Sequence, residues 1–317
     1  MKRGLIRWDR AELPSSALES RLARVNSLLN ARNLPALLVY SDVWRSSHAR
    51  FLTNFMPYWN RSLILIPAGA APVLLCGLSP RVYPWIRSVT VFDEIRPAAK
   101  LMTAMTQLCT ERGWKSIGVL DLAQLPNEVY GPLILSGIEP TNIPASEVIC
   151  FDDAEFSMRR RAARMAREIL AVELPNGAGR SDYALTGALE RSLRMAGAED
   201  AVILLSTGNT APRPASGATL GDHYSVSLAL EYCGHWVRVT RAHTTPDNQN
   251  LLQERFRDAL AVSAGAQVET LSGPYPFEST HSADSPVIAL TIETTIGGAR
   301  LFFGDSCLGT ARGLELL

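Results

Sequence analysis

Residues Ser225–Ala242 read SVSLALEYCGHWVRVTRA, and this stretch decides the fold of the second half of the chain. Apolar side chains alternate on both sides of Cys233 and Gly234, which is typical of two β-strands joined by a tight turn. The apolar residues are Leu228, Leu230 and Tyr232 before the turn and Trp236, Val237 and Val239 after it. The stretch therefore predicts a β-hairpin with at least one buried face.

Length and composition favour an ordinary globular protein. The chain has 317 residues, a formal net charge of +0 and 47% apolar residues, enough for two domains with a sizeable core. The balanced charge does not favour nucleic acid as a partner, and no apolar run approaches the length of a membrane span. The five cysteines are scattered without metal-ligand or disulfide spacing, which predicts a reducing, cytoplasmic location.

The first part of the chain alternates between strand and helix patterns. Strand-like runs are predicted at residues 35–40, 62–67, 73–76, 89–92 and 116–120, with helices at 17–32 and 101–112. This alternation predicts an α/β domain over residues 1–150. A second domain is expected over residues 151–317, opening with two helices, the second of which spans 182–196 and is closed by Gly197.

Several segments together resemble the creatinase, aminopeptidase P and Xaa-Pro peptidase (prolidase-like) superfamily. The hairpin lies between Gly221-Asp222 and Thr240-Arg241, and residues 40–55 (YSDVWRSSHARFLTNF) and 288–293 (IALTIE) match other parts of the pattern. The resemblance implies an α/β N-terminal creatinase-like domain followed by a shortened α+β pita-bread domain.

Members of this superfamily that are metallopeptidases hold two divalent metals with five side chains. The resemblance places Ser227, Arg238 and Ala311 at three of these positions, and only Glu293 is a metal ligand of the expected type. The stretch that would supply the histidine ligand contains His281, but without the glycine that the pattern requires. Since an arginine offers no lone pair to a metal, we expect no metal and no other cofactor.

Creatinase has the same fold and no catalytic metal, so loss of the metal leaves catalysis open. It relies on a histidine as general acid and base, a task that suits a side chain with a pKa near neutral. The candidates here are His223 and His235, with Glu293 to hold a cationic group or to move a proton. Each histidine has an alternative structural interpretation, on the surface for His223 and in packing for His235.

The candidate residues for substrate binding are mostly arginines. Trp59 and Arg61 resemble a creatinase segment that enters the active site of the partner subunit and contacts the substrate carboxylate. Arg238 and Arg241 could supply further positive charge, although Arg238 could instead pair with Glu293 or Glu231 and Arg241 could be structural. These residues imply a homodimer that shares its pocket between subunits.

Two functions follow from the sequence, and whether the protein is an enzyme stays open. The first is a metal-independent, creatinase-like hydrolase or lyase acting on a small amino-acid-like carboxylate. The second is a non-catalytic pseudopeptidase that binds a ligand or an active paralogue. A hydrolase that retains a single metal is a remote third interpretation.

Overall fold

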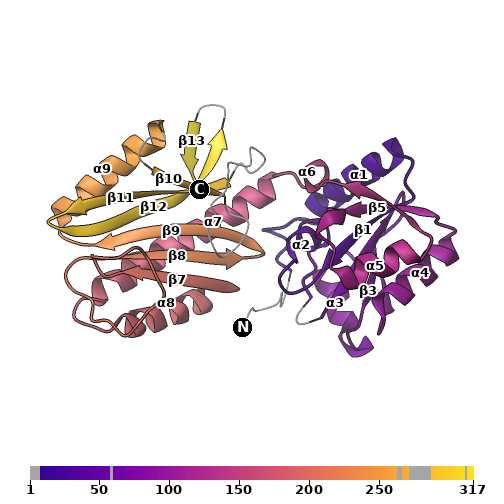
Figure 1. The fold of residues 1–317 in the computed structure, drawn as a ribbon, viewed down its shortest axis with the longest axis horizontal. Coiled ribbons are helices and arrows are strands. Elements are labelled where there is room, and N and C mark those ends of the chain that lie inside the picture. The colour runs from indigo at the N-terminus through magenta and orange to yellow at the C-terminus, as the bar shows by residue number, and fades with distance from the viewer. Residues whose placement is uncertain (1–7, 58–59, 263–265, 271–286, 311–312) are drawn as a thin grey trace. The chain divides into compact units, whose positions relative to one another are not determined.

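A computed structural model describes residues 8–57, 60–262, 266–270, 287–310 and 313–317 of the chain. The chain divides into two compact units, one ending at Ala154 and the other running from Glu155 to Leu317. Each unit is built around its own sheet (Figure 1). Within the described ranges, no helix combines the length and the apolar character needed to cross a membrane.

The first unit contains a six-stranded sheet in the order β4-β3-β2-β1-β5-β6. Its strands are β1 (Ala36–Ser41), β2 (Ser62–Pro67), β3 (Val73–Cys76), β4 (Glu94–Pro97), β5 (Ser116–Leu120) and β6 (Glu139–Ile143). Strand β2 is antiparallel to both of its neighbours, whereas the pairs β3–β4, β1–β5 and β5–β6 are parallel. The carboxyl ends of β1, β3, β4, β5 and β6 therefore lie at one edge of the sheet.

Helices cover both faces of this sheet. They are α1 (Ser15–Ala31), α2 (Ser47–Thr53), α3 (Tyr83–Val89), α4 (Leu101–Arg112), α5 (Asn127–Leu135) and α6 (Ala145–Val148), with short 3-10 turns at Pro80–Val82 and Leu122–Gln124. Residues of α1, α2 and α3 form one core with alternate strand residues, and residues of α4 and α5 form a second core with the others. Strands β1, β2 and β3 are buried on both sides, which explains their continuous apolar runs.

One strand prediction in this unit is wrong. Residues 89–92 were expected to form a strand, but Val89 ends α3 and the strand follows later, as β4. Phe92 still enters the core, where its ring packs edge-on against Phe55 at 5.7 Å between ring centres. The apolar character of this run therefore reflects a buried connection, which periodicity alone does not distinguish from a short strand.

The second unit contains a curved sheet in the order β10-β11-β12-β9-β8-β7, with β13 paired to β12 (Figure 1). Its strands are β7 (Asp200–Ser206), β8 (Tyr224–Tyr232), β9 (His235–His243), β10 (Ala266–Thr270), β11 (Val287–Ile296), β12 (Ala299–Thr310) and β13 (Gly313–Leu316). Its helices are α7 (Asp153–Glu173), α8 (Asp182–Ala196) and α9 (Pro246–Val262), with a 3-10 turn at Leu174–Asn176.

The predicted hairpin is confirmed as β8 and β9. Cys233 and Gly234 have φ angles of 49° and 83°, and two positive values at the centre of a two-residue loop are characteristic of a type I′ turn. Ser227 lies opposite Thr240 in the resulting register, and Ala229 lies opposite Arg238. One face of the hairpin carries fully buried Leu228 and Val239, while the other carries hydroxyl groups and Arg238.

Candidate functional site

The polar face of the second sheet, defined here as Ser225, Ser227, Arg238, Thr240 and Ser306, includes two of the positions at which the resemblance implies metal ligands in the metallopeptidases. Ser227 is 6% exposed, and its hydroxyl accepts a hydrogen bond of 3.1 Å from the hydroxyl of Thr240. Thr240 is its direct cross-strand partner. The first expected ligand position is thus occupied by a serine whose hydroxyl group is hydrogen-bonded to the hydroxyl group of Thr240.

Arg238, at the second ligand position, is buried and forms an ion pair with Glu269 of β10. Its Nη1 donates to Glu269 Oε2 at 2.7 Å, and both side chains are nearly excluded from solvent. Two small residues, Ser306 and Ala289, occupy the strands between them, and Ser306 also bonds the backbone of Arg238 on both its N–H and its carbonyl. Because these two side chains are small, the long side chain of Arg238 can extend over β12 and β11 to reach Glu269 on β10.

Burial opposes charge on both members of this pair. It lowers the pKa of Arg238, against the opposite effect of the nearby Glu269 carboxylate. Burial likewise raises the pKa of Glu269, against the lowering effect of Arg238. Because an arginine keeps its proton in proteins, the pair carries a permanent cation whose charge Glu269 balances.

Glu293 is not bonded to Arg238, so this one of the two predicted partners of Arg238 is wrong. Glu293 is exposed on β11, where both of its oxygens accept hydrogen bonds from Arg300, at 2.7 and 2.9 Å. The hydrogen bond from Arg300 lowers the pKa of Glu293. In the strand register, Glu269 of β10 lies opposite Ala289 of β11. Ala289 is four residues before Glu293, which is about 13 Å along the strand.

The position expected for the last metal ligand, Ala311, lies outside the described residues. The residue directly opposite Glu293 on β12 is Phe302. Thr310, the residue before Ala311, is eight positions further along β12, or about 27 Å for an extended strand. Because the ligands of one metal pair must converge, a second ligand beside Glu293 would have to stand at position 302, and the ring of Phe302 offers none.

The two candidate histidines lie at opposite ends of the hairpin. His223 precedes β8, and its Nδ1 is 2.9 Å from the hydroxyl oxygen of Thr244, just beyond the end of β9. His235 opens β9, is 8% exposed and has its Nε2 3.5 Å from a carboxylate oxygen of Glu155. Since β9 spans about 27 Å between these ends, the histidines cannot serve one reaction centre together.

Arg241 points to the helix-covered face of the sheet, away from Arg238. Three positions separate the two arginines on β9, and an odd separation on a strand places side chains on opposite faces. Arg241 Nη2 donates to Asp305 at 2.7 Å, and Arg167 of α7 donates to the same carboxylate at 2.8 and 2.9 Å. Arg241 therefore links β9 to β12 and, through the shared carboxylate of Asp305, to α7. Its contacts are those of a structural residue.

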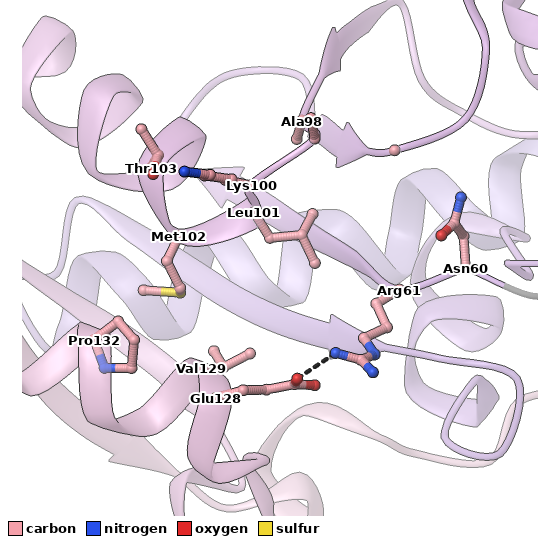
Figure 2. A pocket seen from close by; sticks show the side chains of 12 residues that line it. Asn60, Arg61, Ala98, Lys100, Leu101, Met102, Thr103, Glu128, Val129 and Pro132 are labelled. Carbon is pink, nitrogen blue, oxygen red and sulfur yellow. Dashed lines mark hydrogen bonds and ion pairs between the residues drawn. The ribbon is translucent and has the colours of Figure 1, made fainter.

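Of the two residues expected to reach a partner subunit, Trp59 lies outside the described residues. Arg61 immediately precedes β2 in the first unit and forms an ion pair with Glu128 of α5 (Figure 2). His281, the candidate histidine ligand, also lies outside the described residues.

The residues at the expected ligand positions do not fit a pair of metal ions. Ser227 is a neutral hydroxyl and Arg238 is a cation, and the residue opposite Glu293, Phe302, is apolar. Within the described part of the chain, no three His, Cys, Asp or Glu side chains are grouped as a metal site requires. Sequence reasoning missed Glu269 and Asp305, whose buried carboxylates pair with Arg238 and Arg241, because these partners are distant in sequence.

Comparison with known proteins gives strong structural matches and no sequence match. No family model and no curated protein matches the chain. An X-Pro aminopeptidase from Thermotoga maritima matches with a TM-score of 0.72 at 13% identity, over 93% of this chain and 96% of that one. A prolidase from Pyrococcus horikoshii matches with a TM-score of 0.68 at 14% identity, over 94% and 97%.

A third match is an Xaa-Pro dipeptidase from Bacillus anthracis, with a TM-score of 0.67 at 17% identity, over 94% of this chain and 97% of that one. All three matches span both units and nearly the whole of each solved chain. At such low identity they establish the architecture and leave the activity open. The chain thus has the two-domain pita-bread fold of the creatinase and aminopeptidase P superfamily.

Proposed function

We propose that this protein is a non-catalytic pseudopeptidase, a binding protein built on the Xaa-Pro peptidase fold. The buried ion pair between Arg238 and Glu269 carries this proposal. It puts a permanent cation where the fold's metallopeptidases need a ligand, and it uses the nearest buried carboxylate to neutralise that cation. The arginine has no electron pair to offer a metal, and losing Glu269 would leave its buried charge uncompensated.

The alternative of a metal-independent enzyme is less well supported by the described residues. A general acid–base mechanism needs a histidine or carboxylate near the groups that bind substrate. His223 and His235 lie at opposite ends of β9, and Glu293 is held by two hydrogen bonds from Arg300. Arg238 and Arg241, the expected anchors for a carboxylate, are each bonded to an acidic side chain.

The proposal includes the reducing compartment that the sequence predicts. All five cysteines are free, and Cys76, Cys109 and Cys307 are buried in the cores. Burial raises the pKa of Cys109 to about 11 and that of Cys307 to about 12, which keeps these two thiols protonated and unreactive at neutral pH.

An assay of dipeptide hydrolysis tests the proposal. The purified protein is incubated with Xaa-Pro dipeptides and with Mn²⁺, Co²⁺ or Zn²⁺ in turn, and free proline is measured. We expect no release above the buffer control, and no difference for the variant Glu293→Gln. Release that a chelator abolishes would establish a metallopeptidase, and release that resists chelation but disappears in Glu293→Gln would establish the metal-independent enzyme.

A further inference from the structure

The first unit contains a pocket of about 600 Å³ at the edge where the carboxyl ends of its parallel strands meet. Gly77 follows β3, Ala98 follows β4, and Arg61 precedes the antiparallel strand β2, so all three lie at this edge of the sheet. The first turns of α4 and α5 supply the remaining walls. Ligands of open α/β sheets bind at this edge, and the volume is typical of small-molecule sites.

The pocket has a charged pair at one end and an apolar stretch beside it. Arg61 and Glu128 lie together at that end, where Arg61 Nη1 donates to Glu128 Oε2 (Figure 2). Leu101, Met102 and Val129 line the space beside this pair, and Lys100 and Thr103 lie beyond them, away from Arg61. An occupant that matches the charged pair and the apolar stretch has a charged head and an apolar body.

The ion pair between Arg61 and Glu128 is open to a ligand. The Arg61 side chain is 57% exposed and that of Glu128 is 48% exposed. Pairs this exposed contribute about 0–1 kcal/mol to stability, so separating them costs little. Among the described residues Arg61 uses one nitrogen in this bond, which leaves the rest of its planar guanidinium to bind a carboxylate with two parallel hydrogen bonds.

Two opposite charges side by side select a ligand with the complementary arrangement. A simple carboxylate would meet Arg61 but would lie against Glu128, and a simple amine would meet Glu128 but would lie against Arg61. An α-amino acid carries its ammonium and carboxylate groups on one carbon atom, so each can face its opposite partner at once. The apolar walls then suit a large hydrocarbon side chain.

We propose that this pocket binds a free α-amino acid with a large apolar side chain. The site lies wholly within the first unit and uses none of the residues at the former metal positions. It is therefore independent of the proposed loss of peptidase activity.

Titration calorimetry on the full chain tests the ligand class with three matched probes. L-phenylalanine carries both charges, 3-phenylpropanoate lacks the ammonium group, and 2-phenylethylamine lacks the carboxylate. We expect L-phenylalanine to bind and each analogue to bind at least tenfold more weakly. Equal binding of all three would mean that only the apolar walls matter, and absence of binding by L-phenylalanine would also overturn the proposal.

Three variants test the residues. Arg61→Met and Glu128→Met should each weaken L-phenylalanine binding at least tenfold, while thermal unfolding stays unchanged. Lys115→Met removes an exposed cation at the start of β5, on the opposite edge of the same sheet, and should leave binding unchanged. If Arg61→Met alters folding, Arg61→Lys is tested in its place. Lysine keeps the positive charge but loses the planar guanidinium, so we expect L-phenylalanine to bind more weakly than to the wild type and more tightly than to Arg61→Met. Wild-type affinity in both Met variants, or equal weakening by Lys115→Met, would refute the assignment.

Discussion

Arg238 and Glu269 form the pair whose loss should be most costly to the second unit. Glu269→Gln leaves the buried guanidinium without its carboxylate, and breaking such pairs costs about 3–5 kcal/mol. Glu293→Gln is the matched control, because it removes one member of an exposed pair and should cost less than about 1 kcal/mol. Urea unfolding of both variants measures the difference, and equal losses would show that Arg238 does not depend on Glu269.

A double substitution separates the charge from the packing. Arg238→Met combined with Glu269→Leu removes both charges and keeps apolar volume in the same space. Buried ion pairs are often replaced in this way with little loss. We expect the double variant to recover most of the stability that Glu269→Gln loses, in the same urea titration. If the double variant is as unstable as Glu269→Gln, the loss of stability comes from side-chain shape and packing and not from the unpaired charge.

Asp182 makes the second unit sensitive to acid. The residue is 2% exposed, and its carboxylate accepts hydrogen bonds of 2.8 Å from the backbone N–H groups of Ser216 and Gly217. Burial acts to raise the pKa of Asp182, but the backbone donors outweigh it and hold the pKa below its usual value. The charged form therefore stabilises the fold at neutral pH, and this contribution is lost as the pH falls below about 4.

The variant Asp182→Asn should accordingly be destabilised by about 1–3 kcal/mol at pH 7. The difference from the wild type should shrink toward pH 3, because the wild-type carboxyl is then being protonated. Asp258→Asn, at an exposed position of α9, is the control and should match the wild type at both values. Unfolding curves at several pH values measure the difference in the free energy of unfolding between Asp182→Asn and the wild type. A difference that does not vary with pH would contradict the stabilising role of the Asp182 charge.

At the level of elements, the close pairing of β11 and β12 depends on a glycine. Gly304 lies opposite Thr291, and a Cβ at Gly304 would come within 2.5 Å of the carbonyl oxygen of Leu290 and 2.7 Å of the Thr291 hydroxyl. Both obstacles belong to the neighbouring strand β11, and its backbone carbonyl cannot rotate away. The strands can approach this closely only because residue 304 has no side chain.

We expect Gly304→Ala to lower the melting temperature clearly, since the strands must move apart. Gly187→Ala provides the opposite control. Gly187 is exposed on α8 with no atom near the space for a Cβ, so alanine there should raise stability by up to about 1 kcal/mol. Calorimetry should show a lower melting temperature for Gly304→Ala and a higher one for Gly187→Ala. An unchanged melting temperature in Gly304→Ala would show that the backbone of β11 can move to make room for the methyl group.

Elements with local signals could be predicted from the sequence, and elements that depend on distant partners could not. Helix α8 has the predicted bounds because Leu185 and Leu189 repeat at helical spacing and Gly197 ends the run. Strand β6 and helix α5 gave no clear pattern, since β6 is half-polar and α5 contains Pro132. The pairing of Arg238 with Glu269 joins residues 31 positions apart across intervening strands, which no local pattern encodes.

At the scale of the whole molecule, we expect a symmetric homodimer. The sequence resemblance implies it, and two-fold pairing is the commonest arrangement of protein oligomers. Light scattering at micromolar concentration should report twice the 34.6 kDa of one chain. A mass of 34.6 kDa alone would contradict this expectation, and a larger mass with a second co-purifying chain would identify a heteromer instead.

The ion pair of Arg238 and Glu269 also limits what could be engineered at this position. An aspartate at position 238 would leave the buried carboxylate of Glu269 without its cation and would add a second buried carboxylate to the same face of the sheet. The single substitution would thus produce a less stable protein before any metal could bind. A metal ligand at position 238 therefore requires at least two substitutions at once, one of them replacing Glu269.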